Sequence, residues 1–176
     1  MGLVLELSIN LSRRQLQSTE VVESLLKNTK EFGIDPHELI LEITESIAMF
    51  DVEYAPERLR QLHELGFRLS IDDFGTGYSA LSQLHEMPVD ELKVDMSFVR
   101  RIHTNEGLQV IQAIASIGHA LNLTLVAEGV EDRQSVERIE ELGISLLQGN
   151  FFSPALSESE LFDFVGTRID QFVSNR

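Results

Sequence analysis

Oxygen-bearing side chains and one lysine recur in this sequence at one kind of place, the end of a short apolar run. Amide and carboxylate oxygens are the ligands that Mg²⁺ and Mn²⁺ prefer, whereas zinc favours the cysteines that this chain lacks. The five histidines fall on predicted helices or at their starts, so we do not expect them to be ligands. The oxygen donors and the lysine are Asn10, Glu42, Glu45, Asp72, Asp73, Lys93, Asp95, Glu128 and Gln148.

The adjacent pair Asp72 and Asp73 suits two neighbouring metal ions, because one carboxylate can be directed to each. Two such ions can generate a hydroxide and stabilise an in-line displacement at phosphorus. Lys93 would add a fixed positive charge for a phosphate or an attacking water. The two glycines of the loop DDFGTGYS (72–79) are typical of a turn that needs positive φ, and beside the aspartates they suggest a mobile loop that adjusts the metal site.

Each of these residues also has a simple structural explanation when it is taken singly. An Asp after a strand often caps a helix, and a Lys in a strand usually reaches towards water. A Glu in that position is often solvated, and an Asn often belongs to a turn. Six consecutive apolar runs that end in this way nevertheless favour a common site, in which several carboxylates would repel one another unless a cation is bound or their pKa values rise.

The elements that position these residues alternate between strand and helix. Amphipathic stretches at 20–31, 55–65, 106–121 and 132–142, and another after Ser157, separate the apolar runs. Such alternation predicts parallel strands in an α/β fold, either an open doubly wound sheet or a (β/α) barrel. In both architectures the active site lies at the carboxyl ends of the strands. The predicted strands are 3–10, 39–44, 67–72, 91–95, 123–128 and 144–148.

Length and composition restrict the class of protein. A chain of 176 residues without cysteine predicts one domain (1–176) and excludes disulfides. A net charge of −15 argues against binding of duplex nucleic acid or an anionic membrane. No apolar run has membrane-spanning length and no secretory pattern opens the chain, so we expect a cytoplasmic protein with no membrane insertion by this segment.

Six motifs of the chain closely resemble those of the EAL-domain family, in the family's order and at about its spacing. The likeness runs from about residue 3 to about residue 165, and DDFGTGYS is nearly diagnostic alone. It implies a barrel of the (β/α)₈ type that hydrolyses cyclic di-GMP to linear pGpG with Mg²⁺ or Mn²⁺. The motifs are SINLS (8–12), EITE (42–45), DDFGTGYS (72–79), LKVD (92–95), VAEGVE (126–131) and QG (148–149).

The resemblance also implies roles for individual residues. It makes Lys93 the group that holds the catalytic water, and Glu128 a general base or a residue that supports the metal ligands. Glu45 would anchor the loop beside the metals, and Gln148 would line the site. The implied ligands are Asn10, Glu42 and Asp72 for one metal and Asp73 for the second.

The sequence departs from the family pattern in two places. The tripeptide Glu-Ala-Leu is absent, and about six strand–helix units are present where the barrel has eight, which predicts an N-terminally truncated EAL-like domain with two open sheet edges. We therefore expect weak or no activity from the isolated chain, and a complementing chain or homodimer over the gap. Asn150 and the order Pro154-Ala155 also differ from the family's usual residues. The resemblance further implies an upstream sensory or GGDEF domain.

Three functions are compatible with these residues. The first is a metal-dependent cyclic di-GMP phosphodiesterase. The second is a non-catalytic module that binds cyclic di-GMP or a protein partner through the same scaffold, which the absent Glu-Ala-Leu segment favours. The third is a metal-dependent barrel enzyme that acts on another phosphoester.

Overall fold

The computed structural model describes residues 5–50, 55–77 and 81–174 of the chain. Residues 3 and 4 of the first predicted strand, and residues 78 and 79 of the glycine-bearing loop, lie outside these ranges. Within them, all strands pair in parallel in the order β1-β2-β3-β4-β5-β6. The strands are β1 (Leu7–Asn10), β2 (Leu39–Thr44), β3 (Arg68–Phe74), β4 (Glu91–Val94), β5 (Thr124–Ala127) and β6 (Leu146–Leu147).

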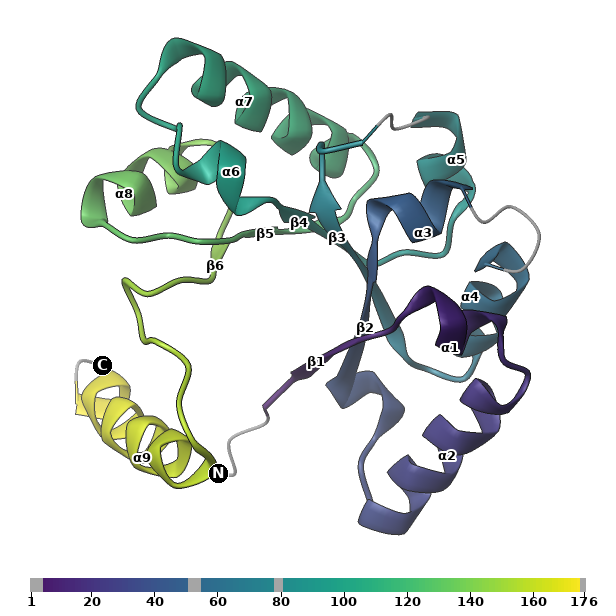
Figure 1. The fold of residues 1–176 in the computed structure, drawn as a ribbon. Helices are drawn as coiled ribbons and strands as arrows, with labels where there is room; N and C mark the ends of the chain where they lie inside the picture. The colour runs from purple at the N-terminus through teal and green to yellow at the C-terminus, as the bar shows by residue number, and fades with distance from the viewer. Residues whose placement is uncertain (1–4, 51–54, 78–80, 175–176) are drawn as a thin grey trace.

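The strands curl into an arc with helices along its outer side, so the sheet forms part of a barrel (Figure 1). This confirms the predicted α/β fold of the (β/α) barrel kind and the number of strand–helix units expected. Three short helices, α1, α3 and α6, were not predicted. The helices are α1 (Arg13–Gln17), α2 (Glu20–Phe32), η1 (Pro36–Glu38), α3 (Glu45–Phe50), α4 (Ala55–Glu64), α5 (Leu81–Glu86), α6 (Met96–Val99), α7 (Asn105–Ala120), α8 (Arg133–Glu141) and α9 (Glu158–Ser174).

Alternation of side chains along the strands separates the core from the site. In β2, Leu39, Leu41 and Ile43 belong to the apolar core, whereas Glu42 points to the inner side of the arc. The core continues through the outward residues of β3 and β4 and the apolar faces of α4 and α7. The fold thus buries one face of each strand against helices and leaves the other face for polar side chains.

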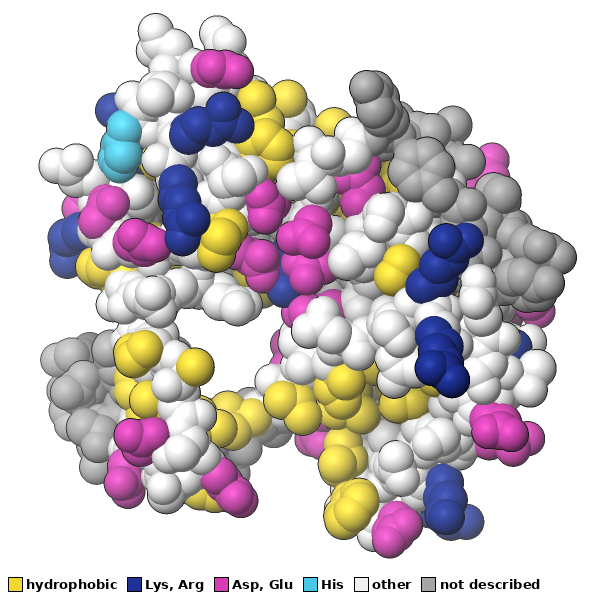
Figure 2. All heavy atoms as spheres, in the orientation of Figure 1, with side chains coloured by type: hydrophobic (Ala, Val, Ile, Leu, Met, Phe, Trp, Pro, Cys, Tyr) yellow, Lys and Arg dark blue, Asp and Glu magenta, His cyan; other side chains and the backbone are white. Residues whose placement is uncertain are grey.

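The two edge strands differ from the central ones. All four residues of β1 are exposed, and Leu7 keeps 58% of its surface accessible. Space-filling atoms show apolar side chains beside the open side of the arc (Figure 2). In and just before β1, the exposed large apolar side chains are Leu5, Leu7 and Ile9. Among the described residues, each edge strand has a neighbouring strand on one side only, which leaves its other backbone edge open to pairing.

The prediction of a strand over 144–148 was wrong in its length. Only Leu146 and Leu147 pair with β5 as a regular ladder, opposite Val126 and Ala127. Gln148 still donates its N–H to the carbonyl oxygen of Ala127 at 2.9 Å, so the chain follows β5 for a little longer. An edge strand lacks the second neighbour that extends regular pairing, which explains the short element.

Helix α9 closes the described part of the chain and lies across the opening from β1 (Figure 1). Its first turns expose Leu161 and Phe162. Among the described helices, α9 included, none combines the length and the apolar character needed to cross a bilayer.

Candidate active site

Lys93 is the centre of a buried charged cluster at the carboxyl ends of the strands. Its Nζ lies 2.9 Å from Glu42 Oε1, 3.3 Å from Asp72 Oδ1 and 2.6 Å from Glu128 Oε1. The four residues come from β4, β2, β3 and the position after β5, so parallel strand order brings them together. Because Lys93 is only 4% exposed, these ion pairs lie in a region of low dielectric and hold the lysine in one place.

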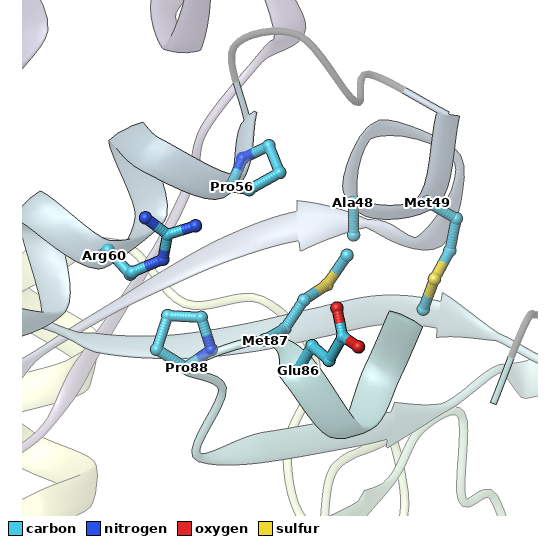
Figure 3. Close-up of a pocket in the computed structure, with 7 residues that line it drawn as sticks. All are labelled: Ala48, Met49, Pro56, Arg60, Glu86, Met87 and Pro88. Atoms are coloured by element: carbon cyan, nitrogen blue, oxygen red, sulfur yellow. The ribbon is translucent and has the colours of Figure 1, made fainter. Parts of the chain in front are cut away.

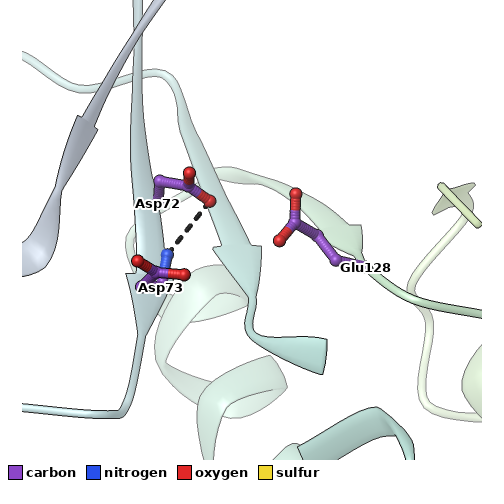
Figure 4. Close-up of side chains that lie close together, drawn as sticks. All are labelled: Asp72, Asp73 and Glu128. Atoms are coloured by element: carbon purple, nitrogen blue, oxygen red, sulfur yellow. Dashed lines mark hydrogen bonds between the residues drawn. The ribbon is translucent and has the colours of Figure 1, made fainter. Parts of the chain in front are cut away.

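A bulge in β3 directs both aspartates to this cluster. Between Ile71 and Phe74 the pairing with β4 shifts, so that three steps along β3 match two along β4. Asp73 has a φ of 56°, in the left-handed region, and its N–H donates to Asp72 Oδ1 at 3.0 Å. In a regular strand adjacent side chains point to opposite faces; the bulge allows Asp72 and Asp73 to lie on the same side (Figure 4).

The environment shifts the pKa values of Asp73, Glu128 and Lys93. Burial raises the pKa of Asp73, and the neighbouring carboxylates Asp72 and Asp95 raise it further. Burial also raises the pKa of Glu128, against the opposing effect of its hydrogen bond to Lys93. Burial disfavours the charged form of Lys93, but its hydrogen bonds to Glu128 and Glu42 outweigh this effect and raise the lysine pKa, so the ammonium stays charged.

The cluster has the donor set of a cation site. Oxygen atoms of Asp72, Asp73 and Glu128 all lie within 4.8 Å of one another (Figure 4). With Glu42 included, four carboxylates face one lysine, so negative charge is left uncompensated when all are ionised. Carboxylate oxygens at this spacing fit a hard divalent cation such as Mg²⁺ or Mn²⁺.

Glu45 holds the glycine-bearing loop next to the aspartates. It is the first residue of α3 and is 2% exposed. Its Oε2 accepts hydrogen bonds from the N–H groups of Gly75 at 2.9 Å and Gly77 at 3.2 Å. A Cβ at Gly77 would approach the Glu45 carboxylate to 3.0 Å, so the small residue permits this close contact.

The other two predicted site residues lie at the edges of the sheet. Asn10 ends β1 in register with Glu42, and Gln148 follows β6 beside the end of β5. Both are exposed, and within the described residues neither side chain forms a hydrogen bond or ion pair with the Lys93 cluster. The same rim thus carries all the predicted residues, but only those of the central strands touch one another.

Sequence reasoning gave Asp95 no role, although it ends β4 in the motif that carries Lys93. Its Oδ1 accepts the N–H of Ser97 at 3.0 Å and so caps α6, while its carboxylate acts on Asp73. Its position two residues after Lys93, at a strand end, could have indicated a role in the site. The same position is also typical of an ordinary helix cap.

Comparison with known proteins identifies the family. A model of the EAL domain matches residues 2–155. The oxygen sensor protein DosP of Escherichia coli is 42% identical over 156 residues, 88% of this chain and 20% of DosP. MucR of Pseudomonas aeruginosa, a bifunctional diguanylate cyclase and cyclic di-GMP phosphodiesterase, is 40% identical over 144 residues, 81% of this chain and 21% of MucR. The chain therefore spans about a fifth of the length of these relatives.

Solved structures agree in fold. The MucR phosphodiesterase in complex with c-di-GMP superposes with a TM-score of 0.85 at 38% identity, over 89% of this chain and 64% of that one. BlrP1 of Klebsiella pneumoniae, in a complex with manganese and cyclic di-GMP, gives a TM-score of 0.79 at 32% identity, over 85% of this chain and 38% of that one. The fold, the motif order and the family match together show that this chain belongs to the EAL domain family.

Proposed function

We propose that this chain carries the central part of a metal-dependent phosphodiesterase site that hydrolyses cyclic di-GMP to linear pGpG. The observation that supports it most is the contact of Lys93 with Glu42, Asp72 and Glu128, next to the paired aspartates of the β3 bulge. A lysine on β4 that is held among acids of β2, β3 and the end of β5 suits a site for water, cation and phosphate together.

The residues divide the task by position. Glu42, Asp72 and Asp73, with Asn10 at the edge, would hold two divalent cations, Mg²⁺ or Mn²⁺. When bound, such a pair lowers the pKa of water and stabilises charge on the attacked phosphate. Lys93 orients the attacking water, and Glu45 keeps the loop after Asp73 in place. Gln148 would line the pocket for the substrate.

Hydrolysis adds one water across one phosphodiester bond. The water oxygen forms a new bond to phosphorus, the bond from phosphorus to the ribose oxygen breaks, and that oxygen leaves with a proton. In this proposal Glu128 takes the proton of the attacking water, a role supported by its burial, which raises its pKa and makes the carboxylate a stronger base than an exposed one. Its hydrogen bond to Lys93 keeps it directed at the same point.

A second function is favoured by the exposed edges. Asn10 lies on a strand of which every residue is exposed, so one proposed ligand is not fixed by neighbours on both sides. A module that binds cyclic di-GMP or a protein without hydrolysis would tolerate this. In both cases a complementing chain or a second copy over the open side would fix β1.

The cellular setting is also part of the proposal. We propose a cytoplasmic location, and no binding of duplex nucleic acid because the chain carries a net charge of −15. The names of DosP and MucR, an oxygen sensor and a protein with cyclase activity, support a larger protein with a sensory or cyclase (GGDEF) domain.

The test is incubation of the chain with cyclic di-GMP and Mn²⁺, with pGpG followed by chromatography and dinucleotide binding followed by calorimetry. We expect slow, metal-dependent formation of pGpG that Asp72→Ala abolishes. Binding without product would favour the non-catalytic module. Neither binding nor product at millimolar cyclic di-GMP would contradict both functions for this chain.

A further inference from the structure

A cavity of about 180 Å³ lies away from the acidic cluster, between the ends of α3, α4 and α5. Its apolar walls include Ala48, Met49, Met87 and Pro88. Met49 and Met87 point into the same space from opposite sides (Figure 3). The volume slightly exceeds that of an engineered cavity of about 150 Å³ that binds one benzene molecule. Methionine side chains adapt readily to an apolar guest.

Two side chains of opposite charge stand at the border of this cavity. Arg60 comes from α4 and Glu86 from the end of α5. The Arg60 guanidinium pairs with Glu57 at 2.7 Å through Nη1, which leaves further N–H donors for another carboxylate. Glu86 forms no ion pair with any described residue. The border therefore suits a molecule that carries both a carboxylate and an ammonium group.

The cavity adjoins α3, the helix whose first residue, Glu45, holds the glycine-bearing loop. Met49 lies four residues after Glu45 on α3, so the two side chains share one face of the helix. The Glu45 carboxylate accepts the N–H groups of Gly75 and Gly77. A molecule packed against Met49 would stabilise α3 and, through Glu45, the loop that follows Asp73.

We propose that this cavity is an effector site for a small zwitterion with an apolar body about the size of a benzene ring, such as an apolar amino acid, and that its occupation stiffens the loop 75–77. The cavity uses none of the residues proposed for hydrolysis. Binding at the cavity can therefore be tested whether or not the chain hydrolyses cyclic di-GMP.

Binding is tested by NMR of the full chain with ¹³C-methyl methionine, titrated with L-phenylalanine. The chain has four methionines (Met1, Met49, Met87 and Met96), so the two in the cavity can be compared with Met96. We expect saturable shifts of Met49 and Met87 only. Phenylacetate and phenethylamine, which each lack one charge, should bind about two- to fivefold more weakly, since exposed charge pairs contribute little.

Arg60→Ala and Glu86→Ala should each weaken binding by about two- to fivefold. Arg133→Ala is the matched control, because Arg133 is also an exposed helix arginine paired with a glutamate, Glu137. Shifts that do not saturate, or equal shifts of Met96, would overturn the site.

The coupling is tested by hydrogen exchange of the Gly75 and Gly77 amides. Saturating L-phenylalanine should slow their exchange at least about twofold, because both donate to Glu45. Unchanged exchange at saturation would overturn the coupling to the loop, while leaving the proposed hydrolysis unaffected.

Discussion

The central strands and the edge strands of this sheet carry residues of the same motif series in very different surroundings. Glu42 and Lys93, on β2 and β4, are buried and joined by an ion pair. Asn10 and Gln148, at β1 and β6, are exposed and form no hydrogen bond or ion pair with that cluster in the described part of the chain. A strand with neighbours on both sides positions its polar residues by itself, whereas an edge strand needs a further partner to do so.

This difference implies that the site forms in two steps. The central strands form the charged cluster from their own packing, and the edges add Asn10 and Gln148 once they are covered. Changes in the centre should therefore act on the stability and cation affinity of this chain, and changes at the edges should act only weakly.

The largest effect should come from Lys93→Met. The substitution leaves the buried Glu42 and the half-buried Asp72 and Glu128 without their cation, which costs about 3–5 kcal/mol in the free energy of unfolding at pH 7. Urea denaturation measures the loss, and Mg²⁺ should restore part of it. Lys27→Met, at an exposed position of α2, is the control. A loss below about 1 kcal/mol would mean that the centre is no better organised than the edges.

Glu45→Ala should have the next largest effect. It removes an acceptor for the N–H groups of Gly75 and Gly77 and leaves a void at a buried position, for a loss of about 2–3 kcal/mol. Hydrogen exchange of the Gly75 and Gly77 amides should become fast, while hydrogen exchange of the β2 amides stays slow. Ser46→Ala, at the exposed neighbouring position, should change neither.

The bulge is tested by Asp73→Gly against Asp73→Ala. Because Asp73 has a φ of 56°, the glycine variant should be about 1 kcal/mol more stable than the alanine variant. Thermal or urea unfolding of the two proteins gives this difference directly. Equal stabilities would show that residue 73 leaves the left-handed conformation and that the bulge does not direct the carboxylate.

A smaller, pH-dependent effect is expected for Asp73→Asn. The pKa of Asp73 is raised above its ordinary value of 3.8, so ionisation opposes folding, and the contribution of Asp73 to stability falls as pH rises through the raised pKa. The free energy of unfolding of the asparagine variant should therefore rise relative to that of the natural chain between about pH 4 and pH 7. Added Mg²⁺ should reduce the gain, and a gain that instead grows towards low pH would contradict the assignment.

Much of the central region was predictable from the sequence. Apolar runs of four to six residues that end in Glu, Asp or Lys predict parallel strands, and parallel strands place their carboxyl ends at one rim. The proximity of Glu42, Asp72, Lys93 and Glu128 follows from that rule.

The bulge and the edges were not predictable in the same way. A side-chain period of two would place Asp72 and Asp73 on opposite faces of the strand. The adjacent acids and the family resemblance predicted a shared site, but neither predicted the register shift that allows it. The short β6 and the exposed Asn10 depend on which strands have neighbours, a property of the whole sheet.

Calorimetric titration of Mn²⁺ into the natural chain, Asp72→Asn and Asn10→Ala tests the central claim most directly. We predict saturable binding that Asp72→Asn weakens at least about tenfold and that Asn10→Ala weakens about threefold or less. No binding by the natural chain, or an equal loss in both variants, would contradict a cation site formed by the central strands.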